Sequence, residues 1–161
     1  MTRKINIVLL CAGKSSRLKF NLPKVILPIN GKTLLERSLY SLNKLNPAKI
    51  IIVTGFKKDL VINSVEKLNY SNLQYAIQKE QLGTGHALKQ ACKFLDDGSI
   101  TLVMNGDTPF VDLETIKNAL KAYNRKKSFF SIATSKPSSP FGYGRVLRDK
   151  KGQILDIGSN D

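Results

Sequence analysis

Short apolar runs alternate with stretches of helical spacing along most of the chain. The runs are rich in β-branched and aliphatic residues and have few polar interruptions, as is typical of strands covered on both faces. They are Ile5–Leu10, Ile50–Val53, Leu73–Ile77 and Ile100–Met104. This alternation leaves few arrangements open, because successive parallel strands need a helical crossover. We therefore expect an α/β fold of the Rossmann-like, three-layer kind, a mostly parallel sheet with helices on both faces.

Apolar residues three and four positions apart predict four helices between and after these strands. Their apolar positions span residues 34–45, 60–68, 87–95 and 113–123. Thr84 and Asp112 precede the last two helices and carry short oxygen-bearing side chains, so we expect them to act as N-caps.

The pattern changes after Tyr123. The run Phe129–Thr134 predicts another strand, and Gly144–Arg148 and Gln153–Ile157 flank an Asp-Lys-Lys-Gly turn, as in a β-hairpin. A chain of 161 residues without repeats or a low-complexity linker predicts a single domain over residues 1–161.

Charge and cysteine usage narrow the range of partners. The 26 Lys and Arg residues outnumber the 12 Asp and Glu residues, giving a formal net charge of +14 that favours polyanions in general. These cations are scattered along the whole chain without a long basic block, so a solvated surface explains them and we expect no specific nucleic-acid partner.

Ile5–Leu10 is too short for a membrane span or secretion signal, so we expect no membrane attachment. Cys11 and Cys92 suit reduced thiols, and we expect a cytoplasmic protein.

A loop of small residues follows the first apolar run, and two cations, Arg17 and Lys24, come after it. In open α/β sheets, ligands bind beyond the carboxyl ends of the strands. Gly13 lets the backbone approach a ligand, and successive backbone N–H groups form an anion-binding concavity. Arg17 can clamp phosphate oxygens and Lys24 adds a mobile charge. The spacing fits neither Walker A nor G-x-G-x-x-G, and two ordinary surface cations remain the alternative.

Several segments carry a resemblance to a known family. They are Leu10-Cys-Ala-Gly-Lys-Ser-Ser-Arg-Leu18, Leu22-Pro-Lys-Val-Ile-Leu-Pro-Ile-Asn-Gly-Lys32, Gln78-Lys-Glu-Gln-Leu-Gly-Thr-Gly-His-Ala87, Asn105-Gly-Asp-Thr-Pro109 and Phe141-Gly-Tyr-Gly-Arg-Val146. In order and spacing, residues 5–157 resemble the sugar-nucleotide pyrophosphorylases and MobA-like nucleotidyltransferases. Within this family, the segments together resemble the uridylyltransferase domain of the bacterial N-acetylglucosamine-1-phosphate uridylyltransferases.

The resemblance implies a nucleotidyltransferase fold and an enzyme that joins UTP to a sugar 1-phosphate, expected to be N-acetylglucosamine 1-phosphate, with release of pyrophosphate. It assigns catalytic roles to Arg17, Lys24 and Asp107, with Asp107 also holding a Mg²⁺ cofactor. The residues that it assigns to nucleotide binding are Leu10, Cys11, Ala12, Gly13, Lys24, Gln78, Gly83 and Thr84, and those for the sugar are Asn105 and Gly144.

Residue chemistry agrees with these assignments. Gln78 offers both donors and acceptors, as the edge of a pyrimidine requires. Asp107 follows the last apolar strand at its carboxyl end, and a hard carboxylate suits Mg²⁺. An aspartate that only shapes the turn before Pro109 is the alternative. We expect His86, the one histidine, to be structural, because a sugar phosphate is already ionised and needs no general base.

Several positions depart from the family pattern. Ser15 and Ser16 replace the usual Gly-Thr, Cys11 replaces Ala, and Asn105 replaces an aromatic residue near the sugar. The family domain also continues with a Glu that contacts the sugar, whose nearest counterpart here is Ser159, and with two Asn residues for the sugar and the metal. A β-helix acetyltransferase domain often follows and makes the enzyme a trimer. We expect this chain to lack these parts.

Three hypotheses are therefore open. The chain is a small nucleotidyltransferase, with an altered sugar site or a partner that completes it. Alternatively, it is a shortened domain that binds nucleotide with impaired turnover, or a lysine-rich polyanion binder that retains the motifs as a relic. A homo-oligomer is compatible with the first.

Overall fold

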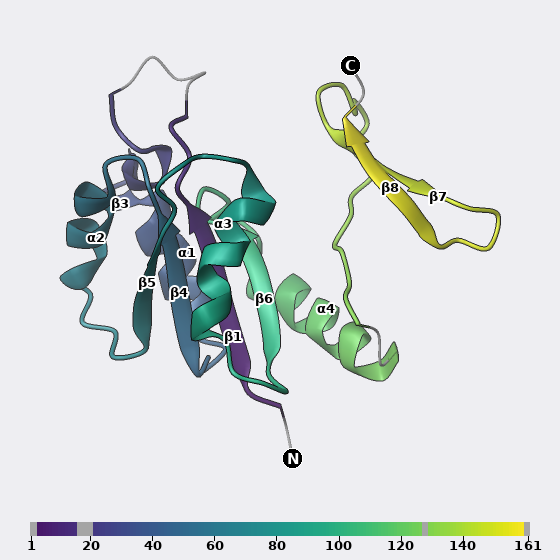
Figure 1. Ribbon diagram of the computed structural model, residues 1–161, viewed down its shortest axis with the longest axis horizontal. Coiled ribbons are helices and arrows are strands. Elements are labelled where there is room, and N and C mark those ends of the chain that lie inside the picture. Colours follow the sequence, from purple (N-terminus) through teal and green to yellow (C-terminus); the bar gives the residue numbers. More distant parts are fainter. Residues whose placement is uncertain (1–2, 16–20, 127–128, 160–161) are drawn as a thin grey trace. The chain divides into compact units, whose positions relative to one another are not determined.

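A four-stranded parallel sheet forms the centre of the protein. The computed structural model describes residues 3–15, 21–126 and 129–159. The sheet consists of β1 (Ile5–Cys11), β4 (Lys49–Thr54), β5 (Leu73–Ile77) and β6 (Ile100–Asn105), in the order β5-β4-β1-β6 (Figure 1). These bounds differ from the predicted strands by one residue at most at either end.

The central strands are covered on both faces, as their continuous apolar sequences predict. Ile7, Val8 and Leu9 of β1 are fully buried, and so are the four residues from Ile50 to Val53 of β4. The register pairs Val8 with Ile51 on one side and with Val103 of β6 on the other. The core of the sheet therefore sits at β1 and β4.

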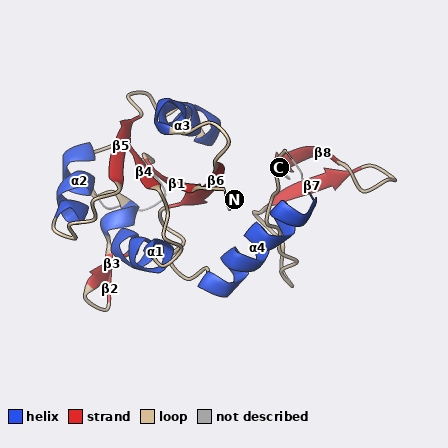
Figure 2. Cartoon of the chain, turned by 90° about the horizontal axis from the view of Figure 1, so that it is seen from below, coloured by secondary structure: helices blue, strands red, loops and turns tan. Residues whose placement is uncertain are grey.

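Helices follow the strands as predicted. They are α1 (Leu34–Asn43), α2 (Lys58–Glu66), α3 (Thr84–Ala91) and α4 (Leu113–Lys126), with short 3₁₀ turns η1 (Lys24–Ile26) and η2 (Cys92–Phe94). Figure 2 shows α3 on one face of the sheet and α1 on the other. Ala87 and Ala91 of α3 pack in one buried cluster with Val8, Ile51 and Val53. The predicted α/β fold with helices on both faces is confirmed.

The helix caps show where local prediction succeeds and where it fails. Asp112 caps α4, because its Oδ1 accepts a hydrogen bond from the Thr115 backbone N–H at 2.7 Å. The prediction that Thr84 caps α3 is wrong. Gly83 occupies the N-cap position with a φ of +93°, so Thr84 becomes the first helical residue. A glycine adopts this conformation at little cost, which moves the start of the helix.

Two small β units complete the fold. β2 (Pro28–Ile29) and β3 (Lys32–Thr33) form a short antiparallel pair before α1. β7 (Gly144–Arg148) and β8 (Ile154–Ser159) form the predicted hairpin, and Asp149 Oδ1 accepts hydrogen bonds from the backbone N–H groups of Lys151 and Gln153 in its turn.

The predicted strand at Phe129–Thr134 is wrong, because the structure assigns no strand to these residues, all of which are exposed. An apolar run forms a strand only where a neighbouring strand accepts and donates its backbone hydrogen bonds, and 129–134 has no such partner among the described residues.

The chain divides into two compact units, residues 1–118 and 119–161. The central sheet lies in the first unit and the β7–β8 hairpin in the second. The single domain expected over 1–161 stays a prediction. None of the helices in the described part of the chain combines the length and the apolarity that a membrane crossing requires.

Replacement of Thr33 by alanine tests the start of α1. The Thr33 Oγ1 accepts a hydrogen bond from the Glu36 N–H at 3.1 Å, and Glu36 Oε2 accepts one from the Thr33 N–H at 2.6 Å. This reciprocal capping box predicts that Thr33→Ala lowers the free energy of unfolding by about 1 kcal/mol. Thr33→Ser keeps the hydroxyl and should retain most of the stability in urea unfolding. Equal stability of wild type and Thr33→Ala would contradict the assigned cap.

Candidate active site

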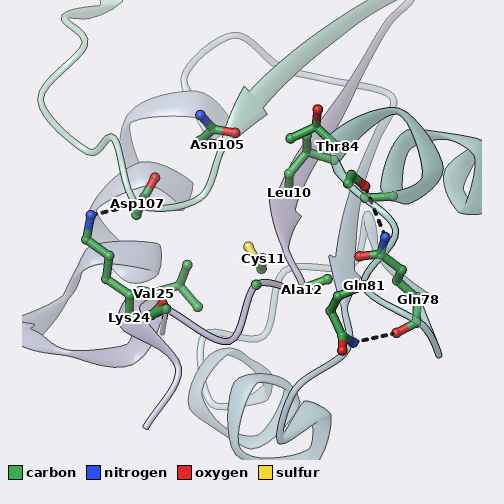
Figure 3. A pocket seen from close by; sticks show the side chains of 14 residues that line it. Leu10, Cys11, Ala12, Lys24, Val25, Gln78, Gln81, Thr84, Asn105 and Asp107 are labelled. Carbon is green, nitrogen blue, oxygen red and sulfur yellow. Dashed lines mark hydrogen bonds and ion pairs between the residues drawn. The ribbon is translucent and has the colours of Figure 1, made fainter. Parts of the chain in front are cut away.

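A pocket of about 670 Å³ opens at the carboxyl ends of β1 and β6 (Figure 3). Residues from four distant parts of the sequence line it: the end of β1, the segment around η1, the segment after β5, and the end of β6 with the residues after it. Open α/β sheets place ligands at this edge, since the crossovers diverge there. The pocket is therefore the candidate ligand site.

The structure brings most of the predicted site residues together in this pocket. Those that line it are Leu10, Cys11, Ala12, Gly13, Lys24, Gln78, Gly83, Thr84, Asn105 and Asp107. Arg17 falls outside the described residues, so its predicted role stays a prediction. Gly144 belongs to the second unit, where it begins β7, and its predicted contact with the sugar likewise stays a prediction.

The close approach of the ends of β1 and β6 depends on a residue without a side chain. The Gly106 N–H donates to the Leu10 carbonyl at 3.0 Å. A methyl group at Gly106 would overlap the Cys11 Sγ and would lie 3.3 Å from the Val25 Cγ1. Gly106 therefore lets Asp107, the next residue, lie at the pocket beside the loop that follows β1.

Cys11 contributes shape to the pocket and no reactive group. It is 3% exposed. Burial, and secondly the negative charge of Asp107, raise the pKa of the Cys11 thiol above its ordinary range. A thiol that stays protonated is a poor nucleophile and a poor metal ligand. Cysteine thus serves here as a small apolar residue in place of the alanine that the family pattern favours.

One cation and one anion face each other at one end of the pocket. Lys24 Nζ lies 2.9 Å from Asp107 Oδ2 (Figure 3). Both side chains are partly exposed, and an ion pair of this kind contributes no more than about 1 kcal/mol to stability. Asp107 Oδ1 makes no hydrogen bond to any described residue. Both groups can therefore exchange this contact for a stronger partner at small cost.

Gln78 and the start of α3 form the other end of the pocket. Gln78 follows β5, is 3% exposed, and is anchored by its backbone N–H, which donates to the Thr54 carbonyl at 2.8 Å. Its side-chain Nε2 donates to the Gly83 carbonyl at 3.1 Å and lies 3.0 Å from the His86 Nδ1. A Cβ at Gly55 would lie 2.6 Å from the Gln78 carbonyl, so a glycine is needed behind this end of the pocket.

Four further lining residues were not predicted: Ser15, Val25, Gln81 and Ala87. Gln81 lies within the same motif as Gln78, and its Nε2 donates to the Gln78 carbonyl at 3.4 Å, so the motif itself carried the signal for it. Val25 and Ala87 line the pocket with apolar groups that also pack in the core, and no chemical pattern marks such positions in a sequence.

The Asp107 carboxylate fits a magnesium ion whose other ligands are water and the phosphates of a bound substrate. Among the described residues, Asp107 is the only acidic one that lines the pocket, and these residues contain no cluster of three or more His, Cys, Asp or Glu side chains able to enclose a metal. Mg²⁺ commonly takes one or two carboxylates and completes its shell with water and substrate phosphates. The unpaired Oδ1 of Asp107 meets this requirement, while a permanent protein-enclosed metal centre does not fit.

The sheet and its pocket define an α/β protein with a candidate ligand site at the carboxyl edge of the sheet, and comparison with known proteins gives the family. The model of the MobA-like NTP transferase domain matches residues 7–157, and the chain belongs to this family. The nucleotidyltransferase fold expected from the sequence is thereby confirmed.

Relatives in several bacteria carry the name bifunctional protein GlmU. The chain is 40% identical over 157 residues to GlmU of Buchnera aphidicola subsp. Acyrthosiphon pisum, covering 98% of this chain and 33% of that protein. It is 38% identical over 151 residues to GlmU of Streptococcus mutans, covering 93% and 32%. The chain thus spans about a third of the length of these relatives.

A solved structure supports the fold independently. HddC from Yersinia pseudotuberculosis, complexed with GMP-PN, matches with a TM-score of 0.75 and 29% sequence identity. The match covers 96% of this chain and 68% of that one.

Substitution of Gly106 tests the packing of the two strand ends. Gly106→Ala should lower the free energy of unfolding by about 1–3 kcal/mol, because the methyl group overlaps the buried Cys11 Sγ. Gly85→Ala is the matched control, since a Cβ there meets nothing within 4 Å and alanine favours the α3 helix. Urea unfolding of both variants measures the difference, and equal stabilities would contradict the assigned contact.

The two thiols should differ in reactivity. A disulfide reagent such as DTNB should modify Cys92, which is exposed, and leave Cys11 unmodified in the native protein. Unfolding in denaturant should release the second thiol. Native Cys92→Ser protein should show almost no rapid reaction, and fast labelling of that variant would contradict the burial of Cys11.

Proposed function

We propose that the chain is a sugar-1-phosphate nucleotidyltransferase that transfers the uridylyl group of UTP to N-acetylglucosamine 1-phosphate. The products are UDP-N-acetylglucosamine and pyrophosphate. The observation that carries the proposal is a single pocket with a Lys24–Asp107 pair at one end and a buried Gln78 amide at the other, in a member of this family. The resemblance of the sequence motifs to the uridylyltransferase domain supports the choice of UTP and of an N-acetylhexosamine phosphate, and the 40% identity to GlmU agrees with it.

The chemistry needs positioning and charge more than proton transfer. An oxygen of the sugar phosphate attacks the α-phosphorus, the bond from that phosphorus to the bridging oxygen breaks, and pyrophosphate leaves with the electron pair. The attacking oxygen is already ionised at neutral pH, so no base is required. Holding the two phosphates in line accounts for much of the rate in such reactions.

Each end of the pocket has a separate task in this proposal. The Lys24 ammonium contacts the nucleotide phosphates together with Arg17. Asp107 Oδ1 holds a Mg²⁺ ion, which when bound neutralises phosphate charge. The backbone of Leu10–Gly13, with Gln78, Gly83 and Thr84, binds the uridine, and Asn105 and Gly144 contact the sugar. Residues 1–161 act as one domain.

Loss of either charge at the phosphate end should be severe. Lys24→Ala and Asp107→Asn should each lower kcat/KM by about 10²–10³, because a well-placed charge in such a site contributes that much. Asp96→Asn is the matched control, since it removes an ion pair with Lys49 of 2.6 Å that lies outside the pocket. Pyrophosphate release from UTP with Mg²⁺ and a panel of sugar 1-phosphates is the measurement.

The outcomes separate the hypotheses. If calorimetry shows that the protein binds magnesium UTP but no pyrophosphate is released, the chain is a nucleotide-binding domain without the proposed activity. Turnover with GTP or CTP in place of UTP would show that the proposed nucleotide is wrong and would leave the proposed type of reaction unchanged. Folded protein that binds no nucleoside triphosphate would overturn the proposal.

A further inference from the structure

Three polar side chains form a continuous chain of contacts behind the nucleotide pocket. Gln78 Nε2 contacts both the Gly83 carbonyl at 3.1 Å and the His86 Nδ1 at 3.0 Å. On the far side of the ring, the His86 Nε2 lies 3.1 Å from the amide of Gln90, one helical turn further along α3. His86 does not itself line the pocket, whereas Gln78 does.

The Gly83 carbonyl fixes which end of the Gln78 amide points at it. A carbonyl oxygen only accepts hydrogen bonds, so the Gln78 nitrogen must face it. The second hydrogen of that nitrogen is then directed at His86 Nδ1, which must be an unprotonated acceptor. A neutral imidazole consequently carries its proton on Nε2. The Gln90 Nε2 also lies 3.3 Å from the His86 backbone carbonyl, a longer contact than the 3.1 Å between Gln78 Nε2 and the Gly83 carbonyl, and Gln90 is less buried than Gln78. A turned Gln90 amide gives up that longer contact and presents its oxygen to the Nε2–H, because the two ends of an amide have nearly the same shape.

The consequence for the pocket is a fixed acceptor. With both hydrogens of its nitrogen engaged, Gln78 directs its Oε1 into the pocket (Figure 3), and this oxygen makes no hydrogen bond to any described residue. Uracil and thymine have an N–H at ring position 3, whereas cytosine has a bare nitrogen there. A buried acceptor pairs with the former and repels the latter.

We propose that His86 is a positioning residue: by accepting from Gln78 Nε2 it holds the Gln78 carbonyl oxygen toward the pocket, and the site therefore selects a pyrimidine with an N–H at ring position 3 over cytosine. This inference rests on the proposed function, because it requires a nucleobase at the Gln78 end. It gives the histidine, which the sequence predicts to be structural, a specific effect on substrate choice.

Loss of the acceptor at His86 removes one of the two contacts that hold the Gln78 amide, so turning the amide to offer a donor to the base then costs only the Gly83 contact. His86→Leu should reduce the preference for UTP over CTP by about three- to tenfold, the effect of one neutral hydrogen bond. The change should appear in KM for UTP with kcat nearly constant, because the base contact is the same before and during the reaction.

Two variants accompany this test. His86→Asn places an amide oxygen where the Nδ1 lies and should restore most of the preference. Lys89→Ala, on an exposed position of the same helix, should leave it unchanged. Thermal unfolding establishes that each variant folds. A folded His86→Leu protein with the wild-type UTP to CTP ratio, in kcat/KM or in calorimetric Kd, would overturn the proposal.

A spectroscopic test needs neither nucleotide nor variant. His86 is the single histidine of the chain, so the ring signals in long-range ¹H–¹⁵N spectra belong to it alone. In mildly alkaline buffer we expect Nδ1 to be unprotonated and Nε2 to carry the proton, and the opposite tautomer would overturn the proposal. A failure to bind any nucleoside triphosphate would overturn the proposed function and base selection together, whereas retained binding with an unaltered preference in His86→Leu would overturn only the role of His86.

Discussion

The parallel pairing of β1 with both β4 and β6 is the interaction on which the rest of the structure depends. Each backbone group of the buried strand finds its partner in one of two neighbours, so neither burial nor register can change without loss of several hydrogen bonds. Parallel strands end at the same edge of the sheet, and three crossovers therefore begin there. That edge places the loop after β1 next to Gly55, which follows β4, and Gly106, which follows β6. Residues as distant in sequence as Leu10 and Asp107 line one pocket for this reason.

Glycines at this edge decide how tightly the loops meet. Gly55 lies behind the Gln78 end of the pocket and Gly106 behind the Asp107 end. A methyl group would clash with the Gln78 carbonyl oxygen at Gly55 and with the Cys11 Sγ at Gly106. Gly83 acts differently, because its positive φ turns the chain into α3 and aims its own carbonyl at the Gln78 amide. The polar groups of the pocket are held by backbone as much as by side chains, which limits their motion before a ligand arrives.

Periodicity was enough to predict the sheet, because strands buried on both faces have an unmistakable continuous apolar sequence. It failed at Phe129–Thr134, where the same kind of sequence lacks a neighbouring strand, and at Thr84, where the backbone freedom of Gly83 outweighs a good capping side chain. The motifs located most of the pocket, since polar and small residues at strand ends are visible in a sequence. Pairings across the fold, such as Lys24 with Asp107 or Gln78 with His86, depend on side-chain direction, which no spacing rule supplies.

The contact between Lys24 and Asp107 has a consequence for how a charged ligand enters. A lone ammonium in this position would attract any passing anion, and a lone carboxylate would repel a triphosphate. Joined together, the two opposite charges compensate each other locally, although the protein as a whole is strongly basic. A molecule that brings both signs, such as a polyphosphate with its metal, can satisfy each group at once by simple exchange. An anion that arrives without a cation would bind Lys24 and leave the Asp107 carboxylate without a positive partner. The Lys24–Asp107 pair therefore favours ligands that carry both an anionic group and a cation.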